Sequence, residues 1–318
     1  MVKSPYSAGH FELSIDGHQS TSYLRSVEGG HVNVAVVGEA IGQDNQQIKH
    51  GSVRDIEPIT IDFGLSGAQD MLKWIQSSWK KDPSYRDGQI THADFNLRAT
   101  LLTEWQRALI LETTFPTLDG SSKEAGYLKV KFLPEEVVTS EGDGHVISNG
   151  RASSKQKSWL PSAFRFTIDG VDGLEYTNKL DSFTIKQTVQ KHYSGTNQYP
   201  ELIPHHITFP SLTGTIAEAY AGGLMAWHRK VIKGTAEHQS QKTGAIEFLA
   251  PDRRTVLFTI TLDGVGISKC NVVQAAANAD SIKRVKFELY VASMSLDGTG
   301  ALGLDGGDFT MATAGNSA

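Results

Sequence analysis

Apolar and polar residues alternate in short runs along most of the chain, and this period of two predicts strands rather than helices. Phe11, Leu13 and Ile15 alternate with polar residues and lead into an Asp-Gly step, which is typical of a half-buried strand that ends in a tight turn. Residues 164–170 repeat this pattern. Further strands are predicted at 32–36, 58–63, 94–101, 105–113, 127–132, 245–249, 255–261 and 282–291.

Two parts of the chain match one another in a way that indicates a duplication. Residues 11–17 and 164–170 lie at an offset of 153 positions, and the same offset pairs Tyr23 with Tyr176 and Val32 with Ile185. Farther along we expect the offset to drift, so that 59–63 pairs with 207–211, Trp79 with Trp227, and 130–132 with 285–287.

This repeat predicts how the chain is divided. We expect a first domain at 1–140, a linker rich in Gly, Ser and Asn at 141–161, a second domain at 162–296 and a flexible Gly-rich tail at 297–318. The second copy departs from the first in three ways. It has Pro210 where the first copy has Asp62, it lacks a tryptophan equivalent to Trp74, and a tight turn is predicted at residues 262–264 where the first copy has none.

One helix is predicted in each half. Residues 66–69 and 215–218 have the spacing of a capping box, and apolar residues at helical spacing follow both segments. We expect each helix to lay one apolar stripe on its sheet, formed by Met71, Ile75 and Trp79 in the first half and by Tyr220, Leu224 and Trp227 in the second. The predicted fold is mainly β, with two tandem β-barrel or β-sandwich domains and one α-helix packed on each sheet.

The composition argues against several classes of function. The net charge is −5 and the cations are scattered, which argues against recognition of a nucleic-acid backbone. Cys270 is the single cysteine, so no disulfide within the chain and no cysteine-based metal site is expected. No apolar stretch approaches the roughly 20 residues of a membrane helix and no signal peptide is recognisable, so we expect no membrane insertion and folding in a bacterial cytoplasm.

Motifs for catalysis are weak. Residues 298–303 match the dinucleotide-binding fingerprint, but a polar, Gly-rich chain end follows where that fingerprint needs a helix. His205 and His206 are adjacent, and adjacent residues on a strand point to opposite faces. We therefore predict no catalytic, cofactor-binding or metal-binding residue and no cofactor, and the chain is not expected to be an enzyme.

The order of elements resembles the contractile-phage tail tube protein family, which is related to the haemolysin-coregulated protein of type VI secretion. The resemblance covers residues 9–138 well and 162–296 more faintly. It rests on the Gly29-Gly30 step, on the helix with Trp74 and Trp79, and on the segments 59–64, 105–116 and 128–136.

This resemblance implies two tube domains and a ring of six such domains whose strands join into one inner barrel, with rings stacked into a hollow tube. Because the chain carries two domains, our hypothesis is a trimer that forms a pseudo-hexameric ring. Possible further partners are sheath or baseplate proteins, and the implied final location is a virion tail or an extracellular injection-system tube.

Two long polar segments, 38–57 and 190–205, are predicted to be loops. By the resemblance they would contact the adjacent ring through Gln43, Lys49, Arg54, Tyr199 and His205. Ordinary solvated loops are the alternative. Two other functions also stay open at this point: a trimeric hub or adaptor of a tail baseplate, and an unrelated carbohydrate-binding or hydrolytic β-sandwich.

Overall fold

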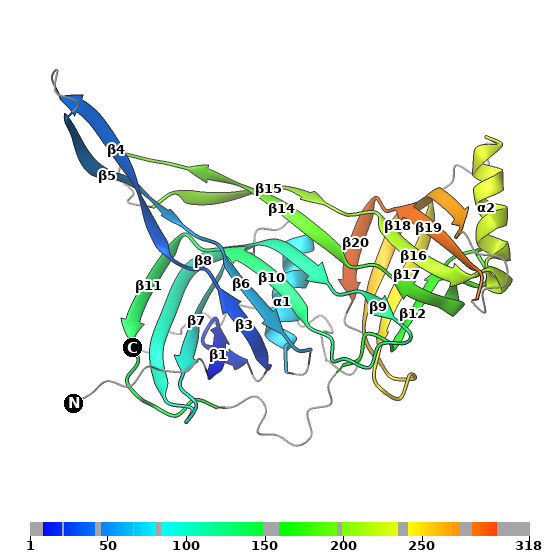
Figure 1. Ribbon diagram of the computed structural model, residues 1–318, viewed down its shortest axis with the longest axis horizontal. Coiled ribbons are helices and arrows are strands. Elements are labelled where there is room, and N and C mark those ends of the chain that lie inside the picture. Colours follow the sequence, from blue (N-terminus) through cyan, green and yellow to red (C-terminus); the bar gives the residue numbers. More distant parts are fainter. Residues whose placement is uncertain are drawn as a thin grey trace, which may run out of the picture.

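The computed structural model describes residues 9–20, 22–41, 46–65, 67–80, 84–148, 159–195, 199–234, 241–273 and 282–297 (Figure 1). Over these residues the chain is mainly β, with two α-helices. The first half contains β1 (His10–Ile15), β2 (His18–Ser20), β3 (Leu24–Glu28), β4 (Val32–Ile41), β5 (Gln46–Ile56), β6 (Ile59–Phe63), α1 (Gln69–Trp79), β7 (Arg86–Ala93), β8 (Ala99–Phe115), β9 (Leu118–Asp119), β10 (Leu128–Leu133) and β11 (Glu136–Glu141).

The second half repeats this order with few changes. It contains β12 (Phe164–Ile168), the 3₁₀ turn η1 (Leu174–Tyr176), β13 (Thr177–Leu180), β14 (Phe183–His192), β15 (Glu201–Thr208), β16 (Leu212–Ala217), the 3₁₀ turn η2 (Glu218–Tyr220), α2 (Gly222–Ile232), β17 (Lys242–Leu249), β18 (Val256–Val272), β19 (Arg284–Tyr290) and β20 (Ser293–Asp297).

Both halves also share one sheet topology, in which every described pair of strands is antiparallel. The strand order is β1-β7-β8-β10-β6-β3 in the first half and β12-β17-β18-β19-β16-β13 in the second. In addition, β11 pairs with β8 and β20 pairs with β18. The chain therefore consists of two tandem copies of one mainly β unit with one helix each, while the domain boundaries at 140 and 162 stay a prediction.

The two longest strands bend at the same place. Both β8 and β18 have 17 residues, and the ninth residue of each has a left-handed backbone, with φ of 48° at Arg107 and 66° at Gly264. Before this residue β8 pairs with β7 and β11, and after it β8 pairs with β10. The predicted tight turn at 262–264 is wrong, because Gly264 provides this bend inside a continuous strand.

The predicted strand at 94–101 is also wrong. Residues 94–98 form the turn between β7 and β8. The Asp94 carboxylate accepts hydrogen bonds from the amides of Asn96 (2.8 Å) and Arg98 (2.9 Å). An Asp side chain that binds the amides just after it favours a turn over an extended strand.

Several details of the helices differ from the sequence prediction. Both helices have 11 residues, and Trp74 and Trp227 are the sixth residue of each, so Trp227 corresponds to Trp74 and not to Trp79. The helices begin after Ala68 and Ala221 without a side-chain cap, so both predicted capping boxes are wrong. Residues 215–218 lie in β16 and η2, and Ser66 lies outside the described residues.

The expected drift of the offset before the helix is wrong as well. Residues 207 and 208 end β15, and β16 is the counterpart of β6 in the sheet order. From β6 to the helix the offset of 153 is retained. The predicted match of 130–132 with 285–287 is wrong too, because 130–132 pair with 59–61 of β6 as 287–289 pair with 212–214 of β16. An alternating strand pattern matches itself after a shift of a few residues, so the pattern alone does not fix the alignment.

The residues predicted to pack the helices on the sheets differ in their burial. Met71, Ile75, Trp79, Leu224 and Trp227 are buried. Tyr220 is not part of this packing, since it lies in η2, is 48% exposed and stacks on Tyr176 with 4.2 Å between ring centroids.

One hydrophobic core runs through both halves. At its centre Phe115 of β8 stacks on Phe183 of β14, with 4.9 Å between ring centroids, and lies 5.6 Å from Phe248 and 6.0 Å from Trp79. Each half also adds a strand to the sheet of the other half, because β14 pairs with β8 and β9 pairs with β13. The two copies are therefore fused through their sheets and their core. Within the described residues, no helix is long and apolar enough to cross a membrane.

The two helices have unequal surroundings (Figure 1). Helix α1 lies between the two halves, where the Gln76 Nε2 atom donates to the Leu296 carbonyl at 2.8 Å, and α2 lies at the outer end of the second half. Six residues of α1 are buried, against two of α2. Trp79, the last residue of α1, is buried, whereas Ile232, the last residue of α2, is 70% exposed.

This difference predicts unequal effects of two matched substitutions. Trp79→Ala should lower the free energy of unfolding of the isolated chain by about 3 kcal/mol or more, because it leaves a cavity beside Phe115. Ile232→Ala should change it by less than about 0.5 kcal/mol. Urea unfolding at low protein concentration measures both, and equal losses would contradict the assignment of α1 to the interface between the halves.

Candidate assembly surface

Two hairpins correspond residue by residue. Strand β4 pairs with β5, and β14 pairs with β15. Each ladder has one irregularity, between Val34 and Val36 in the first hairpin and between Gln187 and Val189 in the second. The two irregularities lie 153 positions apart, which is the offset of the duplication, so Val32 corresponds to Ile185, Val36 to Val189 and Lys49 to Leu202.

The second hairpin, β14–β15, is docked on the first half. Its strand β14 extends the first sheet by pairing with the end of β8, where Phe183 lies opposite Phe115 and Ile185 opposite Thr113. Phe183 and Ile185 are buried. On β15, Leu202 is 1% exposed and packs against Leu109 and Leu133 of the first half.

Two side chains of the first half bind the backbone of Leu202, and a third side chain contacts both of them. The Tyr85 hydroxyl donates to the Leu202 carbonyl at 2.6 Å, and the Leu202 amide donates to the Glu135 carboxylate at 2.9 Å. The Arg107 guanidinium donates to the other Glu135 oxygen at 2.6 Å and lies 4.2 Å from the centroid of the Tyr85 ring. We call Tyr85, Arg107 and Glu135 the clamp.

Local electrostatics keep the clamp in its donating and accepting states. Burial raises the pKa of the Tyr85 phenol, so the hydroxyl keeps its proton. The hydrogen bond with Glu135 raises the pKa of Arg107 further above its already high value. The Leu202 carbonyl therefore meets a hydrogen-bond donor at ordinary pH.

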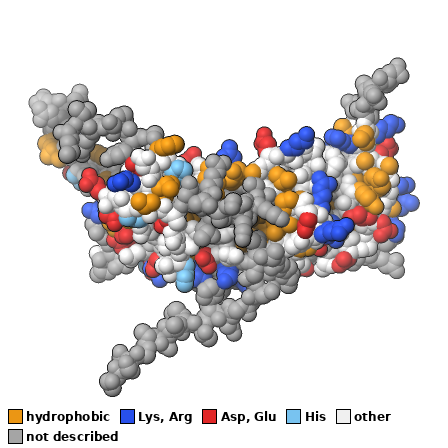
Figure 2. Space-filling model, turned by 90° about the horizontal axis from the view of Figure 1, so that it is seen from below, with side chains coloured by type: hydrophobic (Ala, Val, Ile, Leu, Met, Phe, Trp, Pro, Cys, Tyr) orange, Lys and Arg blue, Asp and Glu red, His pale blue; other side chains and the backbone are white. Residues whose placement is uncertain are grey.

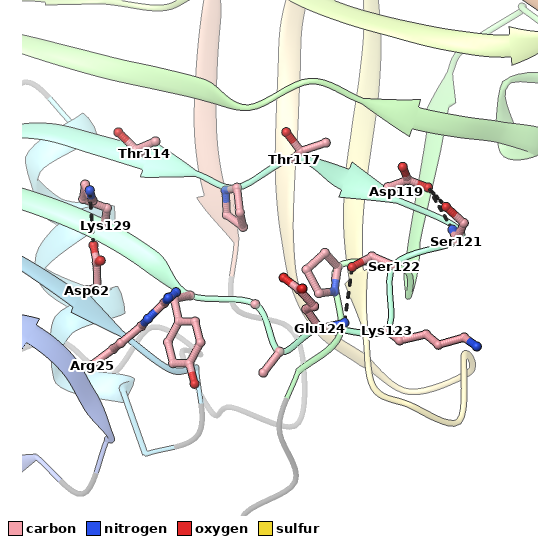
Figure 3. Close-up of a pocket in the computed structure, with 15 residues that line it drawn as sticks. Arg25, Asp62, Thr114, Thr117, Asp119, Ser121, Ser122, Lys123, Glu124 and Lys129 are labelled. Carbon is pink, nitrogen blue, oxygen red and sulfur yellow. Dashed lines mark hydrogen bonds and ion pairs between the residues drawn. The ribbon is translucent and has the colours of Figure 1, made fainter.

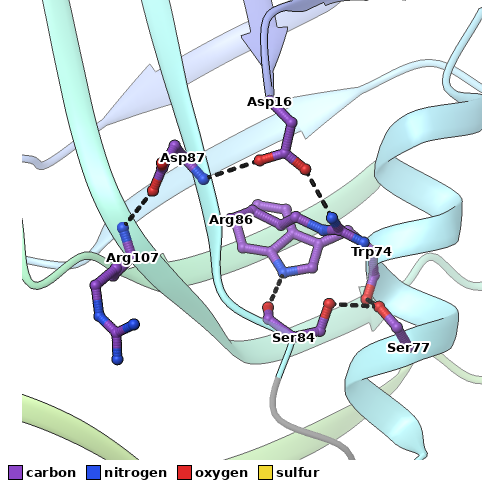
Figure 4. A network of polar contacts seen from close by, with 7 residues as sticks. All are labelled: Asp16, Trp74, Ser77, Ser84, Arg86, Asp87 and Arg107. Carbon is purple, nitrogen blue, oxygen red and sulfur yellow. Dashed lines mark hydrogen bonds and ion pairs between the residues drawn. The ribbon is translucent and has the colours of Figure 1, made fainter. Parts of the chain in front are cut away.

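A polar network holds Arg107 in its left-handed conformation (Figure 4). The Arg107 amide donates to the Asp87 carboxylate at 2.8 Å, and the Asp87 amide donates to Asp16 at 3.1 Å. Arg86 makes an ion pair with the same Asp16 carboxylate at 2.7 Å. The network ties the bend in β8 to the turn after β1, which fixes the position of the clamp.

The first hairpin, β4–β5, has no equivalent support. Every residue of β4 is exposed, including Val36 at 67%, although the strand is rich in valine. The second edge of β4 pairs with no strand in the described part of the chain. At its base Arg54 donates to the Tyr199 hydroxyl at 3.5 Å, and Asp55 forms an ion pair with Lys191. Beyond these contacts the hairpin projects from the molecule as an arm (Figure 1).

The residues proposed from sequence for contacts between rings lie on or beside these hairpins. Lys49 and Arg54 are on β5, Tyr199 lies just before β15, His205 is an exposed residue of β15, and Gln43 lies outside the described residues. The predicted loop at 38–57 is wrong, because 38–41 belong to β4 and 46–56 to β5. The predicted loop at 190–205 is wrong at both ends, where 190–192 belong to β14 and 201–205 to β15. In β5 apolar and polar residues do not alternate, because most of this strand is exposed on both faces, and alternation is the signal that predicts a strand.

A second strand edge without a partner lies at the outer end of the second half. From Gly266 to Val272, β18 pairs with β19 on one side only, and no described strand occupies the side where β8 has β14. Val272, at the position of Phe115, is 51% exposed. Ile232 of α2 is also exposed, and hydrophobic and basic side chains are visible at this end in Figure 2.

No protein-family model matches the chain, and no curated protein matches it. Among solved structures, the chain is similar to a protein of the sheath–tube complex of an extracellular contractile injection system, PVC, at 17% identity and a TM-score of 0.39 over 44% of this chain and 94% of that chain. It is also similar to a chain of the anti-feeding prophage tube-terminating cap, at 17% identity and a TM-score of 0.39 over 45% of this chain and 95% of that chain. A third similar structure is Hcp1 from Flavobacterium johnsoniae, at 11% identity and a TM-score of 0.26 over 43% of this chain and 95% of that chain.

An open hollow of about 820 Å³ lies beside the β8–β10 connection (Figure 3). Among its charged groups, Lys129 pairs with Asp62 at 3.7 Å, and the Asp119 carboxylate accepts from Ser121, which lowers the pKa of Asp119. No group of three or more His, Cys, Asp or Glu residues in the described ranges could hold a metal ion. Residues 298–303, with the dinucleotide-like spacing, lie outside those ranges.

The clamp yields a local prediction. Glu135→Ala should remove the acceptor of the Leu202 amide, which then exchanges its hydrogen at least about tenfold faster, in line with a loss of about 1–3 kcal/mol for a buried unpaired donor. Hydrogen exchange of residues 199–206 measures this. Glu136→Ala is the matched control, because it removes the neighbouring carboxylate and leaves the Glu135 acceptor of the Leu202 amide in place. Unchanged protection of Leu202 in the Glu135 variant would contradict the clamp.

Proposed function

We propose that this chain is a structural subunit, not an enzyme, and that copies of it join head to tail into a closed ring. Three chains supply six β domains around a central lumen, and rings stack into the hollow tube of a tail-like injection system. Sheath or baseplate proteins are the expected further partners, and a virion tail or extracellular tube is the expected location.

The observation that supports the ring most directly is the junction inside the chain. There, a hairpin of the second copy completes the edge of β8 in the first copy. The matching pieces remain unused at the two ends of the molecule, since β4–β5 is a hairpin without a partner strand and β18 is a long strand without a partner hairpin among the described residues. One chain can therefore form with the next chain the same contact that joins its own two halves.

The same correspondence extends to the helices. Inside the chain, α1 is covered by the second copy, and at the outer end the equivalent face of α2 is exposed. A contact between two different surfaces generates a ring or an open filament, depending on the rotation between neighbours. Closure is favoured because a ring leaves no strand edge open to aggregation.

Of the other functions, a threefold hub is the second candidate. The two copies carry different side chains at matched surface positions, as Trp79 and Ile232 illustrate. In a ring of three chains, these two different surfaces would alternate and each would occur three times. Such a threefold arrangement suits an adaptor at the end of a tube. The sugar-binding alternative loses its support, because all five tryptophans, Trp74, Trp79, Trp105, Trp159 and Trp227, are buried.

A disulfide tests the proposed contact. Cys270 of β18 occupies the position of Thr113 in β8, and Thr113 lies opposite Ile185, the counterpart of Val32. Val32→Cys should therefore place a thiol opposite the Cys270 thiol of the next chain, within disulfide distance for an antiparallel pair. After mild oxidation, a non-reducing denaturing gel should show a ladder of linked chains that ends at three.

Two control variants accompany this test. Asn33→Cys points its thiol to the opposite face and should not crosslink, and Cys270→Ser in the Val32→Cys background should abolish the ladder. A ladder that ends at six would overturn the three-chain ring, and the absence of linked chains would overturn the β4–β18 contact itself.

A further inference from the structure

The junction inside the chain and the proposed junction between chains have different chemistry, although they share one backbone geometry. Each clamp position has a counterpart in the second half. Gly264 is the ninth residue of β18, as Arg107 is of β8. Ala292 immediately precedes β20, as Glu135 precedes β11, and both amides donate to the long strand at 3.1 Å. Gln241 immediately precedes β17, as Tyr85 precedes β7.

These counterparts lie together just as the clamp residues do. A Cβ atom placed on Gly264 would lie 2.5 Å from the Ala292 Cβ and 3.1 Å from the Gln241 Oε1 atom. Glycine and alanine offer neither the guanidinium nor the carboxylate of the clamp. The second half therefore has the same backbone arrangement at this site but lacks the guanidinium and the carboxylate that hold a docked hairpin.

The residue at the docked position, and the residues that it packs against, also differ between the two copies. Lys49 stands at the position of Leu202. In the first half Leu202 packs on Leu109 and Leu133, which lie opposite each other on β8 and β10. Their counterparts are Gly266 and Tyr290, also opposite each other. The Tyr290 ring crosses Gly266, with its Cζ atom 1.9 Å from where a Cβ of residue 266 would be, and Tyr290 is 47% exposed.

We propose that Lys49 of one chain binds the face of the Tyr290 ring in the next chain, and that this cation–π contact replaces the clamp at the junctions between chains. The inference rests on the proposed ring. The side chains fit each other chemically, because an ammonium group is attracted to the negative face of a tyrosine ring and the lysine stem covers apolar surface. The ring then has clamped junctions inside chains and unclamped, reversible junctions between them, and it opens and closes at the latter.

Mass photometry or native mass spectrometry over a dilution series tests this, with the protein concentration at which half of the chains are in rings as the readout. Lys49→Ala and Tyr290→Ala should each raise that concentration by about three- to tenfold. In the double variant, that concentration should lie within about twofold of the value for the more strongly affected single variant. Both substitutions remove the same contact, so their effects should not multiply. Tyr290→Phe keeps the ring face and should match the wild type. Both side chains are exposed in the single chain, so the variants should fold, which circular dichroism verifies.

The outcomes separate this inference from the proposed function. Rings that form in the wild type but are insensitive to both substitutions, or effects that multiply in the double variant, would overturn the Lys49–Tyr290 contact and leave the ring intact. A wild-type chain that forms no ring at any concentration would overturn both. Glu135→Ala serves as the internal comparison, since it weakens the clamped junction and should leave the exchange of whole chains between rings unchanged.

Discussion

A strand at the edge of a sheet presents backbone amides and carbonyls that need hydrogen-bond partners, and this requirement dominates the organisation of the chain. The end of β8 meets it inside the molecule, because β14 pairs there and brings Phe183 onto Phe115. That pairing fuses the two copies into one sheet system and one core. The same requirement is left open at β4 and at the end of β18 among the described residues.

Comparison of the two copies separates what the backbone needs from what the side chains specify. The left-handed residue in the long strand and the irregularity in the hairpin are retained in both copies, because they set the bend and the register on which the sheets depend. The residues that change cluster at the junction: Trp79 becomes Ile232, Arg107 becomes Gly264 and Leu202 becomes Lys49. The two copies therefore share a backbone geometry at this site and differ in the side chains around it.

The sequence predicts those parts of the fold that have one buried face. The alternation at 11–15 and 164–168 corresponds to β1 and β12, since their inward residues are buried. It does not predict β5, because the β4–β5 hairpin has no buried face in the single chain. Nor does it predict the clamp, because Tyr85, Arg107 and Glu135 are far apart in sequence and hold Leu202 only through the packing of the second copy on the first. Their types carry no motif, so only the structure brings them together.

The central claim is that each chain repeats toward its neighbour the contact that joins its own halves. A cryo-EM reconstruction of the purified particles, computed without imposed symmetry, tests it most directly. The account predicts three chains around a lumen, with Val32 of one chain opposite Cys270 of the next at the spacing that separates Ile185 from Thr113. A closed particle in which β4 pairs with another β4, or in which only one copy of each chain lines the lumen, would contradict it.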